Sequence, residues 1–184
     1  MKQELEAKLI NEFPKLFGQK DLPPSKSLMC FGCCHDDGWY TLLHNLCEEL
    51  VKSGYEDNVK FAQIKEKFGT LRIYCDYYNP NPTFLEKINR FYSKYWWRIR
   101  YFLCNRLNLY KYISYITGFM DSFCNLKQKR IDKIVEKYEL KSAVTCEMCS
   151  KFADLCIRGH WYKTLCHDCS KAHGYKVLDK DTEE

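Results

Sequence analysis

The sequence lacks the signatures of several common classes of protein. It contains no glycine-rich phosphate loop, no nucleophile elbow and no His-Glu-x-x-His motif, so it has no recognisable catalytic constellation. Residues 1–6 are charged and lack the apolar region of a secretory signal peptide. No uncharged apolar run of about 20 residues is present, which argues against a membrane-spanning helix. The basic residues that interrupt the most apolar segment are Lys94, Arg98, Arg100, Arg106 and Lys111.

Cysteine, by contrast, is abundant, with 12 among 184 residues. Cysteine-rich chains without a secretory signal bind metals more often than they form disulfides, so we expect a reducing, cytoplasmic location. The net charge is +5, and residues 84–141 hold 13 Lys and Arg against 5 Asp and Glu. This basic middle favours an acidic partner such as nucleic acid, an acidic protein or a membrane surface. A solvated helix face would carry the same charge.

Two Cys-x2-Cys pairs near the C-terminus form the most specific pattern. Cys146 and Cys149 are followed, after sixteen residues, by Cys166 and Cys169. This spacing is typical of a tetrahedral zinc site in which each pair grips the ion from one tight turn. Four thiolates leave no position for water or substrate, so the predicted Zn2+ is structural. The alternative is four unrelated buried cysteines. Nearby residues that could replace one ligand are Cys156, His160, His167 and His173.

A second group of metal-binding residue types lies at positions 30–35. It contains Cys30, Cys33, Cys34 and His35. These residues could form half of a second metal site or a redox pair. No second cysteine pair stands at a convincing spacing, and no thioredoxin-like βαβ context is evident. Plain thiols are therefore the favoured interpretation.

The same region suggests one catalytic alternative. His35, Asp36 and Asp37, with His44 or Glu48, could hold a divalent ion that activates water, as in a metal-dependent nuclease or hydrolase. The two aspartates also have a simpler explanation, because either can cap the helix that follows. No third carboxylate motif accompanies them.

Periodicity predicts alternating helices and strands. The expected helices are 2–13, 36–53 and 121–140, and the expected strands are 59–65 and 71–77. The strands form a hairpin whose Gly69 suits a positive φ. Strict alternation places Phe61 and Gln63 on one face and Ile64 on the other. A lone hairpin is marginal in water, so helices should cover one face.

These elements predict an α+β fold. We expect a small β-hairpin or sheet packed with helices, a long aromatic-rich helical insertion, and a C-terminal zinc-ribbon-like element. Residues 159–165 should form the second arm of that ribbon, with Trp161 covering the metal turns. The predicted domains are a helix and hairpin core at 1–82, the insertion at 83–127, a helix and ribbon at 128–177, and a flexible tail at 178–184.

The predicted insertion has an unusual composition. Between Arg90 and Phe119 stand six basic residues, no acidic residue and eleven aromatics. This composition fits a buried helix with a basic outer face, a partner or nucleic-acid surface where rings stack on bases, or an interfacial membrane helix. The candidate partner-binding residues are Arg90, Lys94, Trp96, Trp97, Arg98 and Arg100.

Three stretches together resemble a known family. They are Asp-Gly-Trp at 37–39, Ile-Lys-Glu-Lys-Phe-Gly-Thr-Leu-Arg-Ile-Tyr at 64–74, and the cysteine pairs with the Trp-x2-Thr-Leu that precedes the second pair. The family consists of small proteins of unknown function encoded by bacteriophages and prophages. Its members have a Gly-Asp-Gly-Trp start, a Lys-Glu-Lys-Phe-Gly-Gly-Leu-Arg hairpin and a zinc-ribbon-like end. The resemblance covers roughly 30–77 and 128–170. Thr70 departs from the family's second glycine, and His35-Asp36 stands where a glycine is usual.

The resemblance supplies an origin and no reaction. It implies a protein of the host cytoplasm that binds a host component, including a defence component. With the closed cysteine site and the basic insertion, it favours a zinc-stabilised, non-enzymatic protein that binds a host protein or nucleic acid. The alternatives are the hydrolase at His35–Asp37 and a protein of the membrane surface.

Overall fold

The structure, a computed structural model, describes residues 1–80 and 126–178. The chain divides into two compact units, and the first of them combines residues 1–78 with residues 131–184. The fold is α+β, with helices and two small three-stranded sheets. This agrees with the fold class expected from the sequence.

The first sheet is built on the predicted hairpin, which is confirmed. It contains β1 (Cys33–Cys34), β2 (Val59–Lys67) and β3 (Thr70–Tyr77) in the order β1-β2-β3. The turn residues Phe68 and Gly69 both have positive φ, 52° and 76°, as a tight two-residue hairpin turn requires. β1 runs parallel to β2 over only two residues and carries no sequence signal of its own.

A β-bulge changes which residues of β2 face the core. The pairing with β3 has a register shift between Phe61 and Gln63, so Ala62 is an extra residue on β2. Because of this extra residue, Phe61 and Ile64 are both fully buried. The prediction that they occupy opposite faces is therefore wrong.

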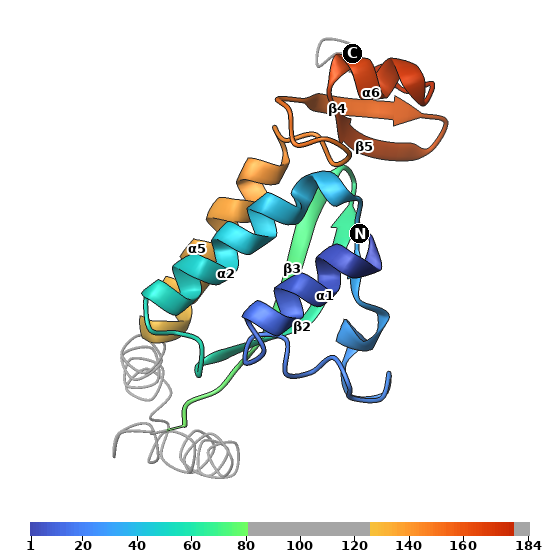
Figure 1. Ribbon diagram of the computed structural model, residues 1–184. Helices are drawn as coiled ribbons and strands as arrows, with labels where there is room; N and C mark the ends of the chain where they lie inside the picture. Colours follow the sequence, from blue (N-terminus) through green and yellow to red (C-terminus); the bar gives the residue numbers. More distant parts are fainter. Residues whose placement is uncertain (81–125, 179–184) are drawn as a thin grey trace, which may run out of the picture. The chain divides into compact units, whose positions relative to one another are not determined.

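Helices cover the buried face of the hairpin (Figure 1). The helices of this region are α1 (Gln3–Glu12), α2 (Tyr40–Lys52) and α5 (Leu126–Ser142), with 3-10 turns η1 (Leu28–Phe31) and η2 (Asp37–Trp39). Their fully or almost fully buried apolar side chains include Leu9, Trp39, Leu43, Leu46, Leu50 and Ile131. Among the described helices, none combines the length and the hydropathy that a membrane crossing requires.

Neither Asp36 nor Asp37 caps the second helix with its side chain. Asp37 Oδ1 accepts a hydrogen bond from the backbone N–H of Lys2 at 2.7 Å. Asp36 forms an ion pair with Lys163, which is distant in the sequence. The capping prediction is wrong because long-range partners occupy both carboxylates.

Helix α5 closes the outer edge of β3. The backbone N–H of Leu71 donates to Ser142 Oγ at 2.8 Å, and that of Ile73 donates to Glu139 Oε1 at 2.7 Å. Tyr77 also donates to Asp132 through its hydroxyl. Side chains of α5 thus take the place of a further strand and satisfy backbone donors that would otherwise be unpaired.

The C-terminal element has a sheet and a small core of its own. Its strands are β4 (Asp154–Arg158), β5 (Trp161–Leu165) and β6 (Lys176–Val177) in the order β5-β4-β6. Helix α6 (His167–Ala172) lies between β5 and β6 in the sequence and beside strands β4 and β5 in Figure 1. The expected second arm of a ribbon is therefore present as β5. Trp161 stands at the β4–β5 turn and is 72% exposed. The expectation that it covers the metal turns is wrong.

A four-cysteine cluster as a candidate metal centre

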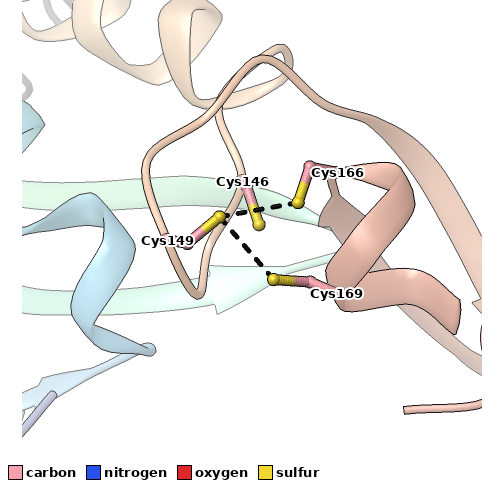
Figure 2. A group of neighbouring side chains, drawn as sticks. All are labelled: Cys146, Cys149, Cys166 and Cys169. Carbon is pink, nitrogen blue, oxygen red and sulfur yellow. Dashed lines mark hydrogen bonds between the residues drawn. The ribbon is translucent and has the colours of Figure 1, made fainter. Parts of the chain in front are cut away.

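The structure brings together the four paired cysteines (Figure 2). The sulfur atoms of Cys146, Cys149, Cys166 and Cys169 all lie within 4.8 Å of one another. Cys149 Sγ is 3.5 Å from Cys166 Sγ and 3.6 Å from Cys169 Sγ. Zinc–sulfur bonds of about 2.3 Å in a tetrahedron separate the sulfurs by about 3.8 Å, so this spacing suits one metal ion.

The first cysteine pair lies on a tight turn after α5. The N–H of Ser150 donates to Cys146 O at 3.0 Å and closes the turn. Ser150 has a φ of 64°, a left-handed conformation that is unfavourable for a residue with a side chain. Its hydroxyl donates to the carbonyl of Gly38, which helps to hold it in this conformation. A contact with the N-terminal core thus supports the geometry of the turn.

The second pair lies at the start of α6. Cys166 is the residue before the helix, and Cys169 lies in its first turn. The backbone N–H of Cys169 points at the Cys166 sulfur and is the main cause that lowers the pKa of this thiol to about 7. Burial raises the pKa of the Cys149 and Cys169 thiols instead, so Cys166 is the cysteine of the second pair whose thiolate, the form that binds metals, is favoured.

The donor set determines what the cluster can do chemically. Four thiolates in a tetrahedral arrangement suit Zn2+ or iron, and they fill every position of the coordination shell. No position is left at which a water molecule or a substrate could bind the metal. The arrangement therefore fits a structural site.

The turn of the first pair packs directly on η2 through Gly38. The N–H of Gly38 donates to Glu147 O at 2.7 Å. A Cβ placed on Gly38 would lie 2.6 Å from both C and O of Glu147 and closer still to Cys146 O. Only a residue without a side chain allows the two backbones to approach this closely.

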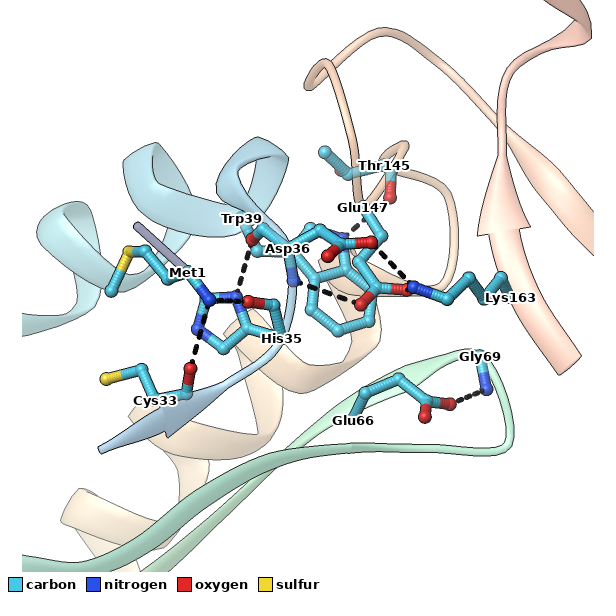
Figure 3. A network of polar contacts seen from close by, with 10 residues as sticks. All are labelled: Met1, Cys33, His35, Asp36, Trp39, Glu66, Gly69, Thr145, Glu147 and Lys163. Atoms are coloured by element: carbon cyan, nitrogen blue, oxygen red, sulfur yellow. Dashed lines mark hydrogen bonds and ion pairs between the residues drawn. The ribbon is translucent and has the colours of Figure 1, made fainter. Parts of the chain in front are cut away.

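A polar network surrounds this contact (Figure 3). The indole Nε1–H of Trp39 donates to Thr145 O at 2.8 Å, and the N–H of Asp36 donates to Glu147 Oε1 at 3.1 Å. Lys163 Nζ lies 2.6 Å from Asp36 Oδ2 and 3.2 Å from Glu147 Oε2. The Glu147 side chain is 2% exposed; its burial raises the pKa of the carboxyl, and Lys163 opposes that shift. The network joins the metal turn, β5 and η2.

The turn of the first hairpin forms a second contact with the C-terminal element. Thr164 Oγ1 donates to Gly69 O at 2.5 Å, and both partners are buried. A Cβ on Gly69 would overlap the Leu155 side chain and lie 3.3 Å from the backbone of Lys163. Thr164 O also accepts from the N–H of Glu147 at 2.9 Å. The candidate metal centre is thus held on the core by both turns, η2 and β2–β3.

The predicted second metal group is not brought together. Cys30 Sγ donates to Ser27 O, whereas Cys34 Sγ faces the carbonyls of Phe31 and Gly32. Within residues 1–80 and 126–178, the four-cysteine cluster is the one group of three or more His, Cys, Asp or Glu side chains whose ligand atoms lie close enough to hold one metal ion. Likewise, Cys156 Sγ faces the carbonyls of Asp154 and Leu165 and is not in the cluster.

The proposed hydrolytic cluster is also dispersed among separate contacts. His44 Nε2 lies 3.1 Å from the Glu12 carboxylate, and Glu48 pairs with Lys52 at 2.8 Å. His35 is buried beside Trp39, with ring centroids 5.8 Å apart. These contacts give each of the three side chains a structural role.

The burial of His35 predicts that the protein is less stable at acid pH. Its Nδ1–H donates to Asp36 O at 2.8 Å, whereas its buried Nε2 has no hydrogen-bond partner among the described residues. The pKa of His35 is lowered to about 4, chiefly by burial; the hydrogen bond to the Asp36 backbone and the charges of Asp36 and Asp37 oppose this shift, whereas the Met1 ammonium adds to it. The unfolded chain, with a pKa near 6.5, binds the proton first. The contribution of neutral, buried His35 to stability is therefore complete above pH 6.5. The free energy of unfolding falls by about 3 kcal/mol as the pH decreases to 4.

Urea denaturation at pH 7.5, 6.5, 5.5 and 4.5 measures this loss. We expect His35→Gln to lack this part of the pH dependence. The test uses the difference in unfolding free energy between wild type and His35→Gln at each pH, because protonation of the metal ligands at low pH affects both proteins equally. Parallel curves for wild type and variant would contradict the assignment to His35.

The predicted partner-binding residues lie outside the described residues. The insertion predicted at 83–127 falls there too, apart from its last two residues. The partner-binding set is Arg90, Lys94, Trp96, Trp97, Arg98 and Arg100.

Sequence reasoning missed the residues that attach the metal centre to the core. Glu147, Ser150 and Thr164 give no signal when each is considered alone. The available signal was the Asp-Gly-Trp stretch at 37–39, together with the glycine at the hairpin turn. Both glycines lie where the C-terminal element touches the core. Comparison of the chain with family models, curated proteins and solved structures finds no match.

Proposed function

We propose that this chain is a zinc-stabilised, non-enzymatic binding protein that engages a protein or nucleic acid partner. The observation that carries the proposal is the gathering of four thiols in one closed cluster that is attached to the core through Gly38 and Gly69. Zinc is the proposed ion because a closed tetrahedron of four thiolates is one of its usual structural settings in proteins. The free energy of zinc binding would stabilise the C-terminal element and its attachment to the core.

The structural roles of the alternative catalytic residues support a non-enzymatic role. Asp36 pairs with Lys163 and Asp37 with Lys2, whereas His35 is buried. A hydrolytic metal site would need these side chains to converge on one open ion. Their separate contacts favour the proposed binding role over the hydrolase.

The proposed binding surface includes the basic aromatic segment between Arg90 and Phe119. Its composition of basic and aromatic residues without acidic ones supports an acidic partner. We also propose the bacteriophage or prophage setting implied by the resemblance, with a host protein as one class of partner. The contact glycines Gly38 and Gly69 fall within the motifs that carry that resemblance.

Affinity capture with the full zinc-loaded chain tests the proposed function. The chain is used as bait in bacterial lysate with and without nuclease treatment. We expect a specific partner that the double variant Trp96→Ala/Trp97→Ala captures at least 10-fold less, because loss of one aromatic anchor costs about 2 kcal/mol or more. The double variant Phe152→Ala/Trp161→Ala, which removes exposed rings elsewhere, is the matched control.

Capture that persists after nuclease treatment indicates a protein partner, and capture that nuclease abolishes indicates nucleic acid. Equal capture by wild type and both variants would contradict a role for the insertion. Hydrolysis of nucleic acid by the metal-loaded wild type, lost in Asp37→Ala, would favour the catalytic alternative.

A further inference from the structure

The solvent-facing side of hairpin β2–β3, here called the outer sheet face, concentrates basic and aromatic residues. Residues paired across an antiparallel ladder share a face, and β3 alternates between buried and outward side chains. Because Ala62 is an extra residue at the bulge, Lys60 before it and Gln63 after it both point to this face. The outward residues are Lys60, Gln63, Lys65 and Lys67 on β2, and Thr70, Arg72, Tyr74 and Asp76 on β3, followed by Tyr78.

Lysine ammonium groups lie over aromatic rings along this face. Lys60 Nζ is 4.7 Å from the ring centroid of Tyr78, and Lys65 Nζ is 5.2 Å from that of Tyr74. Both tyrosines keep more than 40% of their surface exposed, with 43% for Tyr78 and 46% for Tyr74. Each ring therefore presents free surface beside a cation.

The charge of the outer sheet face is mostly uncompensated. Over the described residues, Lys60, Lys65 and Lys67 form no ion pair with a carboxylate. Asp76 is the one acid on the face, and its Oδ2 accepts a hydrogen bond from Gln19 at 2.7 Å. Arg72 reaches Glu139 only at 3.7 Å. The face therefore attracts an anionic partner.

A groove adjoins Tyr74 on the same face. It has a volume of about 390 Å³ and lies between the loop at 24–28 and the middle of the hairpin. Lys26 and Gln63 line it together with Tyr74. The Gln63 amide and the Tyr74 hydroxyl have no hydrogen-bond partner in the described part of the chain. The groove combines an aromatic wall, one cation, the Asp76 carboxylate, and a free amide that can both donate and accept.

We propose that the outer sheet face binds single-stranded nucleic acid. Lysines contact the phosphates, the exposed tyrosine rings stack on unpaired bases, and the groove beside Tyr74 receives one base whose polar edge meets Gln63. An acidic peptide would satisfy the charges, but its carboxylate side chains are not aromatic and would not stack on the tyrosine rings. A duplex keeps its bases stacked inside and presents mainly phosphates. The residues of this face do not belong to the segment between Arg90 and Phe119.

Fluorescence anisotropy with labelled 12-nucleotide oligo(dT) and oligo(U) tests the proposal on the full zinc-loaded chain. We expect Tyr74→Ala to weaken binding about fivefold or more, because the loss of one base–aromatic stack costs about 1–3 kcal/mol. Tyr74→Phe keeps the ring and should stay within about threefold of wild type. Lys65→Ala should reduce the salt slope by about 0.7, the value for one phosphate contact on a single strand.

Matched controls separate this face from other basic surfaces. Lys8→Ala, on the exposed side of α1, should leave the affinity and salt slope unchanged. A 12-base-pair duplex should bind more weakly than the single strand, and a glutamate 12-mer should not displace the single strand at equal charge. Circular dichroism and zinc content establish that each variant is folded.

Three results would overturn the proposal. If wild type binds and neither Tyr74→Ala nor Lys65→Ala changes the affinity, binding occurs elsewhere, and the proposed function survives without this face. If the duplex or the glutamate peptide binds as well as the single strand, the recognition is not of unpaired bases. If wild type binds no oligonucleotide, this face has no such role, and capture with nuclease-treated lysate still decides whether the proposed protein partner exists.

Discussion

Removing the metal with a chelator is expected to unfold residues 143–178 and to leave residues 1–78 folded. The C-terminal element buries only a small cluster of apolar residues of its own, separate from the cluster that joins the hairpin and helices. Elements of fewer than about 40 residues usually need a metal or disulfides to fold. Apparent zinc-binding free energies of about 10–16 kcal/mol are coupled to folding in such sites. Hydrogen exchange should show lost protection in β4, β5 and α6, while β2, β3 and α2 keep theirs.

Two cysteine variants of the same element provide the matched comparison. Cys166→Ser should lose zinc and reproduce the effect of the chelator, whereas Cys156→Ala, a buried cysteine outside the cluster, should retain about one zinc per chain. Metal analysis also separates zinc from iron, which would give a coloured protein. A purified wild type that contains no metal, and that is as stable with the chelator as without it, would contradict the proposed zinc site.

Replacing Gly38 with alanine is expected to destabilise the attachment of the metal centre by about 3 kcal/mol or more. The new methyl group would overlap the backbone of Glu147, which cannot move without displacing the metal turn. Two hydrogen bonds would be lost with the contact, from Gly38 N–H to Glu147 O and from the Ser150 hydroxyl to Gly38 O. Chemical denaturation of the zinc-loaded protein measures the loss of stability. Hydrogen exchange at the amide of Glu147 should also increase.

Gly54→Ala is the control for replacing a glycine as such. Gly54 has a φ of 73°, and no described atom lies within 4 Å of a Cβ placed there. Its replacement should cost about 1–2 kcal/mol, from the left-handed backbone alone, without changing exchange at Glu147. If both alanine variants lose stability equally and exchange at Glu147 stays slow, the contact at Gly38 does not hold the metal centre on the core.

Local signals in the sequence were sufficient for the main elements. Helical spacing in α1 and α2 and alternation in β3 are periodic over several turns or residues, so they predict the elements without knowledge of the rest of the chain. The cysteine spacing is equally local within each pair. The approach of the two pairs to each other was predicted from their chemistry, because two Cys-x2-Cys pairs at this spacing are typical of a single zinc site.

The features that were not predicted depend on partners distant in the sequence. A two-residue strand such as β1 has no periodicity, and the bulge at Ala62 reverses the face of every later residue of β2. Asp36 resembles a helix cap until Lys163 is placed beside it. Glu147 looks like an exposed residue of a metal turn, yet it is buried against the core. In each case the decisive contact lies far along the chain.

The closure of the β3 edge by α5 has a consequence for the order of events during synthesis. Ser142, which accepts from the backbone of Leu71, is made 71 residues later. At about 5–20 residues per second, the ribosome needs roughly 4–14 seconds to add that length. During this interval the nascent hairpin presents unpaired backbone donors to any neighbouring chain. The nascent chain is therefore most exposed to misassociation, and to chaperone binding, before α5 emerges from the ribosome.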